Sequence, residues 1–171
     1  RGAASVVAVD VGYGQLAWKL QSDPRVEVHD RTNVRTLDPA SVAPAPDIVV
    51  GDMSFISLTL VLPALVAAAA PDADFLLMVK PQFEIGKERL GHGGVVRNPE
   101  HHVETVENVA RCAIGLGLDI AAIAPSPLPG PSGNVEYFLY MRRDYPEPIN
   151  PQELTEYIRA AVAEGPAGGA L

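Results

Sequence analysis

The sequence predicts an α/β domain built on a mostly parallel sheet. Short apolar runs that are typical of buried strands alternate along the chain with segments of helical character. The clearest case is central: runs at Asp47–Asp52 and Phe75–Lys80 flank the alanine-rich segment Leu58–Ala70, which is long enough for about three to four helical turns. A strand, a helix and a second strand in this order favour a parallel crossover, with the helix buried against the sheet.

The N-terminal part contributes two further strands. Ala4–Val9 is a β-branched run that ends at Asp10, and Arg25–His29 alternates apolar and polar residues. Gln15–Gln21 lies between them and has the spacing of a short amphipathic helix. The segment 31–46 is polar and contains prolines, so we expect a loop with at most one helical turn.

The C-terminal half continues the alternation after a glycine-rich segment, 81–98, which has no clear period. We expect this segment to be a long, mobile loop beside Lys80. The pattern then predicts a helix from Pro99 to about Leu116, strands over Asp119–Ala124 and Val135–Met141, and a final helix over Leu154–Ala163. Residues 1–164 therefore form one domain, and residues 165–171 are expected to be a flexible tail.

The composition narrows the class of protein. The chain has 171 residues and a net charge of −8, so it would bind nucleic acid weakly by itself. No apolar run reaches the roughly 18 residues of a membrane span. With Cys112 as the single cysteine, the sequence predicts neither a disulfide framework nor a metal site. A cytoplasmic location is the expected one.

Four ionisable residues stand at strand ends: Asp10, Asp52, Lys80 and Glu136. Each one alone is more often a helix cap or a solvated charge than a functional group. Ligands of open parallel sheets bind just outside the carboxyl ends of the strands, so several such residues together indicate a site. Two carboxylates around a lysine can orient and deprotonate a hydroxyl.

Several unusual stretches in the same order carry a family resemblance. They are GDMSFISL (51–58), VKPQFEIGK (79–87), GGVVRNP (93–99) and SPLPGPSGNVEYFLY (126–140), preceded by VVAVDVGYGQLAWKL (6–20) and RTN (31–33). Together they resemble the catalytic domain of the TlyA family, whose members are called hemolysins and also act as ribosomal RNA 2′-O-methyltransferases. That family belongs with the FtsJ-like enzymes, which have a Rossmann-like sheet and use S-adenosyl-L-methionine.

The resemblance implies a role for particular residues. Lys80 would activate a ribose 2′-hydroxyl, and Asp52 and Glu136 would position it. The residues implied for the cofactor are Asp10, Val11, Thr32, Asn33, Asp52 and Phe55, with Asp10 at the cofactor ribose and Asn33 near the adenine. The implied partner is ribosomal RNA or a ribosomal subunit.

The sequence also departs from the family pattern. The family begins with an S4-like RNA-binding domain, followed by a first catalytic lysine, the first strand of the sheet and a Gly-rich cofactor loop, and these do not occur here. We therefore expect an incomplete form with weak or no activity. The strands near residues 4–9 and 25–29 would pair with Ile48–Val50, pair with another copy or remain disordered. Exposed edges favour a homodimer.

Two other readings compete with the methyltransferase. Gly12, Gly14 and Ala17 match a short dinucleotide-binding fingerprint, and Asp30 follows the next strand, which would suit an NAD-binding enzyme. Asp10 would add a like charge near the pyrophosphate, which counts against this reading. The second alternative is a non-catalytic interaction module or a membrane-active hemolysin, but the sequence has no basic amphipathic helix.

Overall fold

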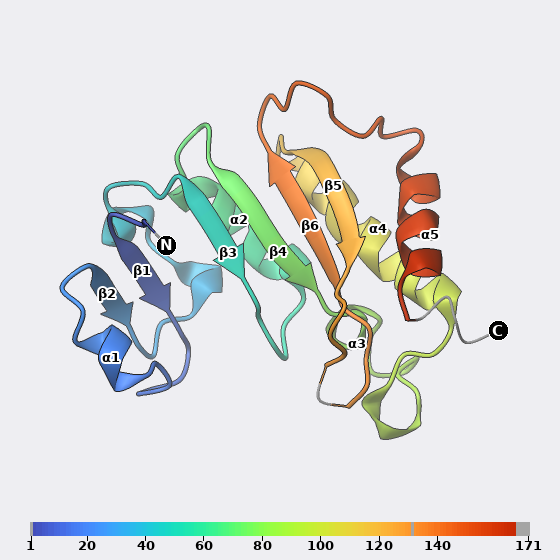
Figure 1. Cartoon of the computed structure of the whole chain (residues 1–171), viewed down its shortest axis with the longest axis horizontal. Helices are drawn as coiled ribbons and strands as arrows, with labels where there is room; N and C mark the ends of the chain where they lie inside the picture. Colours follow the sequence, from blue (N-terminus) through green and yellow to red (C-terminus); the bar gives the residue numbers. More distant parts are fainter. Residues whose placement is uncertain (1, 131, 167–171) are drawn as a thin grey trace.

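The computed structural model describes residues 2–130 and 132–166, and within them strands and helices alternate (Figure 1). The strands are β1 (Val6–Val9), β2 (Val26–His29), β3 (Ile48–Gly51), β4 (Asp74–Val79), β5 (Asp119–Pro125) and β6 (Tyr137–Arg142). The α-helices are α1 (Trp18–Gln21), α2 (Leu58–Ala68), α3 (Pro81–Glu84), α4 (Pro99–Gly115) and α5 (Leu154–Glu164). Short 3₁₀ turns are η1 (Val34–Thr36), η2 (Pro39–Val42) and η3 (His92–Gly94).

The strands form two sheets rather than one mostly parallel sheet, which corrects the expectation from the sequence. The larger sheet has the order β3-β4-β6-β5. β3 and β4 are parallel, as the crossover through α2 requires, whereas β6 runs antiparallel to both β4 and β5. Because β6 runs the other way, its first residues lie at the same edge of the sheet as the last residues of β3 and β4.

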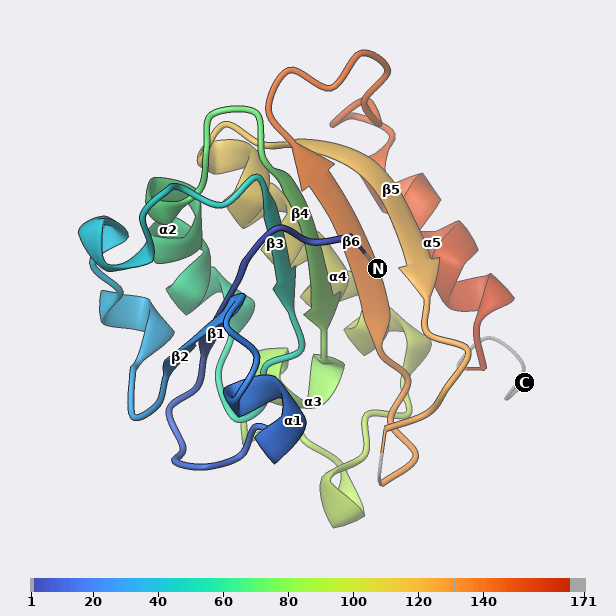
Figure 2. The ribbon, with the colours of Figure 1, turned by 60° about the vertical axis from the view of Figure 1, so that its left-hand side comes forward.

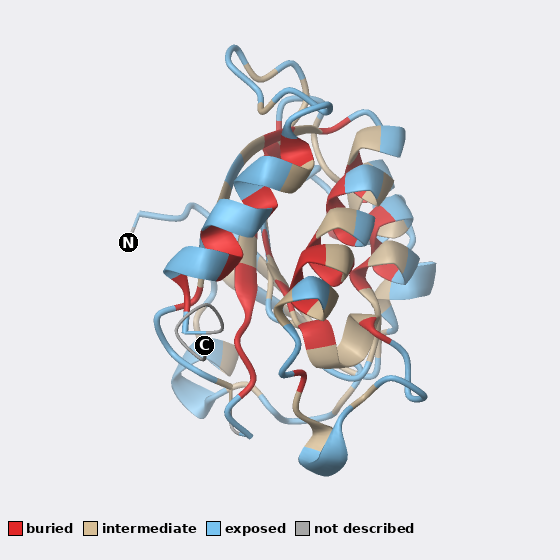
Figure 3. Ribbon diagram, turned by 90° about the vertical axis from the view of Figure 1, so that its right-hand side faces the viewer, coloured by how far each residue is buried: buried red, intermediate tan, exposed pale blue. Residues whose placement is uncertain are grey.

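In Figure 1, helices α2 and α4 lie behind the larger sheet and α5 lies beside β5, and the core fills the space between these helices and the sheet. Along β4, Phe75, Leu77 and Val79 are fully buried while Leu76 faces the other side and is 42% exposed. The same alternation occurs along β6, where the buried residues are Tyr137, Leu139 and Met141. Figure 3 shows buried and exposed turns alternating along the helices on this side.

The two main helices begin at residues suited to that position. Ser57 precedes α2 and its side-chain oxygen accepts the N–H of Thr59, while Asn98 precedes α4 and accepts the N–H of Glu100. Pro99 occupies the first turn of α4, where its missing N–H has no cost. These contacts explain why the two helices begin where they do.

Strands β1 and β2 pair in parallel with each other and form a separate two-stranded sheet. Within the described residues neither strand pairs with β3, so the first of the three alternatives, direct pairing with Ile48–Val50, is wrong. Disorder is wrong as well, because both segments form strands, and pairing with another copy stays a prediction. Figures 1 and 2 show β1 and β3 running in the same direction with their facing edges apart. The adjoining face of the larger sheet is open, with Ile48 62% and Val50 72% exposed.

One shorter expectation also needs correction. The helix expected over Gln15–Gln21 is confined to Trp18–Gln21, because Ala17 has an extended backbone with ψ of 138°. At the other end of the chain, Gly165 is buried, and a Cβ there would lie 2.7 Å from the ring of Pro125. Residues 167–171 lie outside the described part of the chain.

Candidate active site

Asp52, Lys80 and Glu136 meet at one edge of the larger sheet, as the sequence predicts. Lys80 directly follows β4, and the antiparallel register that pairs Val79 with Tyr137 places Glu136 opposite Lys80 when it is continued by one pair. Asp52 directly follows β3, the parallel neighbour of β4. Three separate segments therefore deliver these side chains to a common point.

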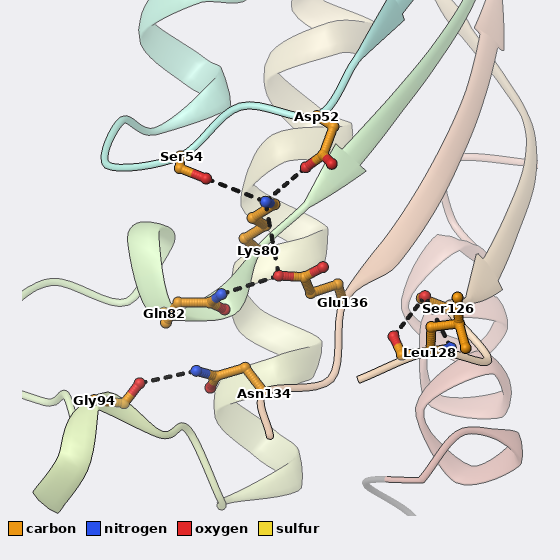
Figure 4. Close-up of polar contacts among 9 residues, drawn as sticks. All are labelled: Asp52, Ser54, Lys80, Gln82, Gly94, Ser126, Leu128, Asn134 and Glu136. Carbon is orange, nitrogen blue, oxygen red and sulfur yellow. Dashed lines mark hydrogen bonds and ion pairs between the residues drawn. The ribbon is translucent and has the colours of Figure 1, made fainter. Parts of the chain in front are cut away.

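The amine of Lys80 is the centre of this group (Figure 4). Its Nζ lies 2.6 Å from Oδ1 of Asp52 and 3.8 Å from Oε1 of Glu136, and it donates a hydrogen bond of 3.2 Å to Oγ of Ser54. The side chains of Lys80 and Glu136 are 12% and 8% exposed, whereas that of Asp52 is 70% exposed. The side chains of Lys80 and Glu136 are thus largely buried, whereas the carboxylate of Asp52 faces solvent.

This arrangement suits proton transfer at a hydroxyl group. A lysine in partly dehydrated surroundings can exchange a proton with a bound hydroxyl, and neighbouring carboxylates stabilise the ammonium that results. Electrostatic interactions of this kind are stronger where water is excluded. The burial of Lys80 and Glu136 therefore favours a chemical role over a surface ion pair.

Asp52, Lys80 and Glu136 are called the trio below. Sequence reasoning missed two polar neighbours of this trio. Ser54 lies in the segment after Asp52, and Gln82 donates from Nε2 to Oε1 of Glu136 at 3.1 Å. Neither follows a periodic pattern. Their position beside Asp52 and Lys80 in the sequence is the signal that could have found them.

The segment 81–98 contains a short helix and is hydrogen-bonded to residues that precede β6. The expectation of a long loop without secondary structure is therefore wrong. The segment begins with helix α3 and is bound by Asn134, whose Oδ1 accepts the N–H of Val96 and whose Nδ2 donates to the carbonyl of Gly94, both at 2.9 Å. Asn134 is 3% exposed. Such a buried pair of hydrogen bonds fixes the path of the backbone beside the trio.

His102 of α4 also contacts the segment 81–98. Its Nε2 lies 2.9 Å from the carbonyl oxygen of Val96, and its Nδ1 lies 3.1 Å from the hydroxyl of Tyr137. Burial lowers the pKa of His102, which favours the neutral ring. Since a carbonyl can only accept, the Nε2–H donates to Val96 and Nδ1 accepts from Tyr137, whose pKa is raised by burial.

The segment that carries Asp52 is fixed by Glu84 of α3. The carboxylate accepts hydrogen bonds from the hydroxyl of Ser57 at 2.6 Å and from the N–H of Leu58 at 2.7 Å. Burial raises the pKa of Glu84, and these two hydrogen bonds oppose that shift. Glu84 thereby joins the start of α2 to the turn that follows Lys80.

Phe55 has an unusual conformation in this segment. Its φ is +63°, a left-handed backbone that is strained for a residue with a bulky side chain. The ring is 90% exposed and lies 5.0 Å, centroid to centroid, from the ring of Phe83. An exposed aromatic residue on a strained backbone is typical of a binding site.

The remaining residues implied for the cofactor follow the two strands of the smaller sheet. Asp10 follows β1, is exposed, and accepts the N–H of Gly12 on Oδ1 at 2.6 Å. The N–H of Thr32 donates to the carbonyl of Asp10 at 2.9 Å, and the Asn33 side chain accepts the N–H of Arg35. Val11 is 74% exposed. The structure brings Asp10 and Thr32 together, but the strands that carry them do not pair with β3.

The geometry gives less support to dinucleotide binding, to a metal site and to membrane insertion. The glycines of the dinucleotide-like fingerprint do not open a long helix, because α1 has only four residues. Across residues 2–130 and 132–166, no three His, Cys, Asp or Glu side chains are arranged to hold a metal ion. In the same residues, no helix combines the length and apolarity needed to cross a membrane.

Comparisons with known proteins identify the family. Residues 1–143 match the FtsJ-like methyltransferase family. The chain is 53% identical over 166 residues to the 16S/23S rRNA (cytidine-2′-O)-methyltransferase TlyA of Mycobacterium tuberculosis, which covers 97% of this chain and 62% of that protein. This chain therefore spans less than two thirds of the length of that relative.

Solved structures agree with this match. A Streptococcus thermophilus protein, provisionally described as a hemolysin, has a TM-score of 0.84 at 36% identity over 95% of this chain and 60% of its own. The N-methyltransferase NodS of Bradyrhizobium japonicum shares the fold, with a TM-score of 0.55 at 11% identity over 82% of this chain and 74% of its own. The expected Rossmann-like methyltransferase fold is confirmed, and this chain belongs to the FtsJ-like methyltransferase family.

Proposed function

We propose that this chain is the catalytic domain of an S-adenosyl-L-methionine-dependent methyltransferase that modifies the ribose 2′-hydroxyl of ribosomal RNA. The observation that carries the proposal is the amine of Lys80, placed between the carboxylates of Asp52 and Glu136 at an edge of the sheet where parallel strands end. The similarity to the M. tuberculosis rRNA (cytidine-2′-O)-methyltransferase supports the choice of substrate.

In this proposal the cofactor is bound by Asp10, Val11, Thr32, Asn33, Asp52 and Phe55. The chemistry of these residues fits S-adenosyl-L-methionine. An exposed carboxylate after a parallel strand, such as Asp10, suits the ribose hydroxyls of a nucleotide. The exposed carboxylate of Asp52 complements the positive charges of the methionine part, and the ring of Phe55 offers an apolar surface. When bound, the cofactor would supply an activated methyl group.

Lys80 would act on the attacking hydroxyl. In its neutral form the amine would accept the proton of the attacking hydroxyl, whose oxygen would take the methyl group that the cofactor supplies when bound. Lys80 becomes an ammonium ion, which Asp52 and Glu136 stabilise from 2.6 Å and 3.8 Å. Fixing the hydroxyl in line with the methyl group accounts for much of the acceleration in such a transfer.

The proposed RNA substrate must be reconciled with the net charge of −8. An acidic chain neutralises few phosphates and releases few counterions, so we expect weak binding to free RNA. Ribosomal subunits, which offer protein surface as well as RNA, are therefore tested beside naked rRNA. Such a substrate would place the activity in the cytoplasm.

A methyl-transfer assay tests the proposal. Tritium-labelled S-adenosylmethionine is incubated with the chain and with rRNA or ribosomal subunits from a host that lacks the modification. We expect label at a site that resists alkaline cleavage, as a 2′-O-methyl group does. Lys80→Ala and Glu136→Gln should lower the rate by about a hundredfold or more, while Glu156→Gln, an exposed carboxylate on α5, should not. Label on a base, or no calorimetric binding of the cofactor, would contradict the proposal.

A further inference from the structure

The segment 52–57 is fixed near both ends by helix α3 and the lysine that precedes it. Near the start of the segment, Nζ of Lys80 donates to Oγ of Ser54 at 3.2 Å (Figure 4). At its end, Oε2 of Glu84 accepts the hydroxyl of Ser57 at 2.6 Å, and Oε1 accepts the N–H of the next residue at 2.7 Å. Lys80 caps α3 and Glu84 is its last residue, so a single helical turn carries both attachments.

Phe55 lies between these two attachments and has a strained backbone. Its φ of +63° is in the left-handed region, which residues with a bulky side chain rarely adopt. The ring is 90% exposed, so burial of the side chain does not offset the strain. Its aromatic neighbour is Phe83, which also belongs to α3 and lies 5.0 Å away between ring centroids. A strained conformation persists only where the surrounding contacts impose it, and here those contacts come from α3.

Glu84 provides the firmer of the two attachments. The hydrogen bond from Lys80 to Ser54 is longer, and the same amine also pairs with Asp52 at 2.6 Å. Glu84 makes two short hydrogen bonds with a carboxylate as acceptor, which are stronger than neutral ones. One of them satisfies an N–H in the first turn of α2, for which the helix itself supplies no acceptor. The end of the segment two residues after Phe55 therefore depends on Glu84.

We infer that Glu84 is a positioning residue that holds Phe55 in its left-handed conformation and so presents the ring to the cofactor. The inference rests on the proposed function, in which Phe55 contacts S-adenosyl-L-methionine. Without Glu84, the end of the segment is released and the backbone at Phe55 relaxes to a conformation that most residues prefer. The left-handed conformation is then populated about a tenth of the time, and the affinity for the cofactor falls by about the same factor.

Nuclear magnetic resonance tests the conformation of Phe55. Backbone chemical shifts depend on φ and ψ, so the shifts of this residue report whether its backbone is left-handed. In Glu84→Ala they should move to the values of an extended or right-handed residue. In Glu84→Gln they should stay in place, because the amide can accept the N–H of Leu58 and donate to Oγ of Ser57. The hydroxyl of Ser57 can then donate to Oγ1 of Thr59, 2.7 Å away.

A matched control and a further variant complete this experiment. Glu88→Ala makes the same change at an exposed glutamate of the segment 81–98 and should leave the shifts of Phe55 unchanged. Glu84→Asp keeps the charge but shortens the side chain by one carbon, so it should move the shifts in the same direction as Glu84→Ala. It decides the question if Glu84→Ala does not fold. Native shifts at Phe55 in the folded variant would refute the positioning role.

Calorimetric titration with S-adenosylmethionine tests the consequence for binding. Glu84→Ala should raise the Kd about tenfold, whereas Glu84→Gln should leave it unchanged. In the methyl-transfer assay, the KM for the cofactor should rise by the same factor while kcat changes by less than about twofold. In a Phe55→Ala background, Glu84→Ala should have little further effect on the Kd. An undiminished loss in that background would refute the inference, because Glu84 would then act on binding by another route.

The two proposals fail in different ways. If the shifts of Phe55 move as expected but the unsubstituted chain binds no S-adenosylmethionine, the hold of Glu84 on Phe55 is supported and the proposed function is rejected. If the chain binds the cofactor and transfers its methyl group while Phe55 keeps its native shifts in a folded Glu84→Ala, the proposed function stands and the positioning role is refuted.

Discussion

Asn134→Ala removes the attachment between the residues that precede β6 and the segment beside Lys80. Two hydrogen bonds are lost, a buried one from the N–H of Val96 and a partly buried one to the carbonyl of Gly94. Each is worth about 1 kcal/mol, and a buried donor left unpaired adds a further cost, so we expect a loss of about 2–4 kcal/mol in the free energy of unfolding. For a domain of this size that is a fall in Tm of roughly 4–16 °C.

Urea unfolding and hydrogen exchange measure this prediction together. The free energy of unfolding gives the total loss, and the exchange rate of the Val96 amide reports the local contact. Asn108→Ala, an exposed position on α4, should change stability by less than about 0.5 kcal/mol. If Asn134→Ala loses less than about 1 kcal/mol and Val96 remains protected, Asn134 does not fix this segment as the structure indicates.

Three further predictions concern stability and association. Because burial lowers the pKa of His102 from 6.5, the unfolded chain binds a proton more readily than the folded one. The contribution of His102 to stability is therefore complete above pH 6.5 and is lost as the pH falls below it; urea titrations at several pH values should show a weaker pH dependence in His102→Gln. Phe75→Ala removes a fully buried ring from β4 and should lower the free energy of unfolding by about 3–5 kcal/mol in the same measurement. We also propose that the chain dimerises through the open edge of β3, so Val50→Lys should shift sedimentation velocity profiles towards the monomer; unchanged profiles would exclude this edge.

Local patterns in the sequence were sufficient for the central elements. The apolar runs ending at Asp52 and Lys80 have strand character, and Pro99 marks the start of α4. Periodicity carries no information on strand direction, however, so the antiparallel orientation of β6 was not predicted from it. Glu136 was a candidate because it lies at the end of a predicted strand, and the family resemblance then grouped it with Asp52 and Lys80.

Contacts between distant segments account for what the sequence did not predict. The hydrogen bonds of Gln82 and Asn134 join residues 54 and 38–40 positions apart, and no short-range rule predicts such pairs. His102 is a different case. It shares the buried face of α4 with Val106 and Val109, four and seven residues further on, so helical spacing could have identified it as a core residue.

The antiparallel neighbours β4 and β6 make the trio insensitive to the length of the chain between them. Helix α4 and strand β5 could gain or lose residues over evolution without altering the distance between the amine and its carboxylates, provided that Val79 still faces Tyr137. A slip by a single residue would have the opposite effect, because it turns every side chain of β6 to the other face and replaces Glu136 with Val135. Deletions inside β6 should therefore abolish the proposed methyl transfer even where the protein still folds.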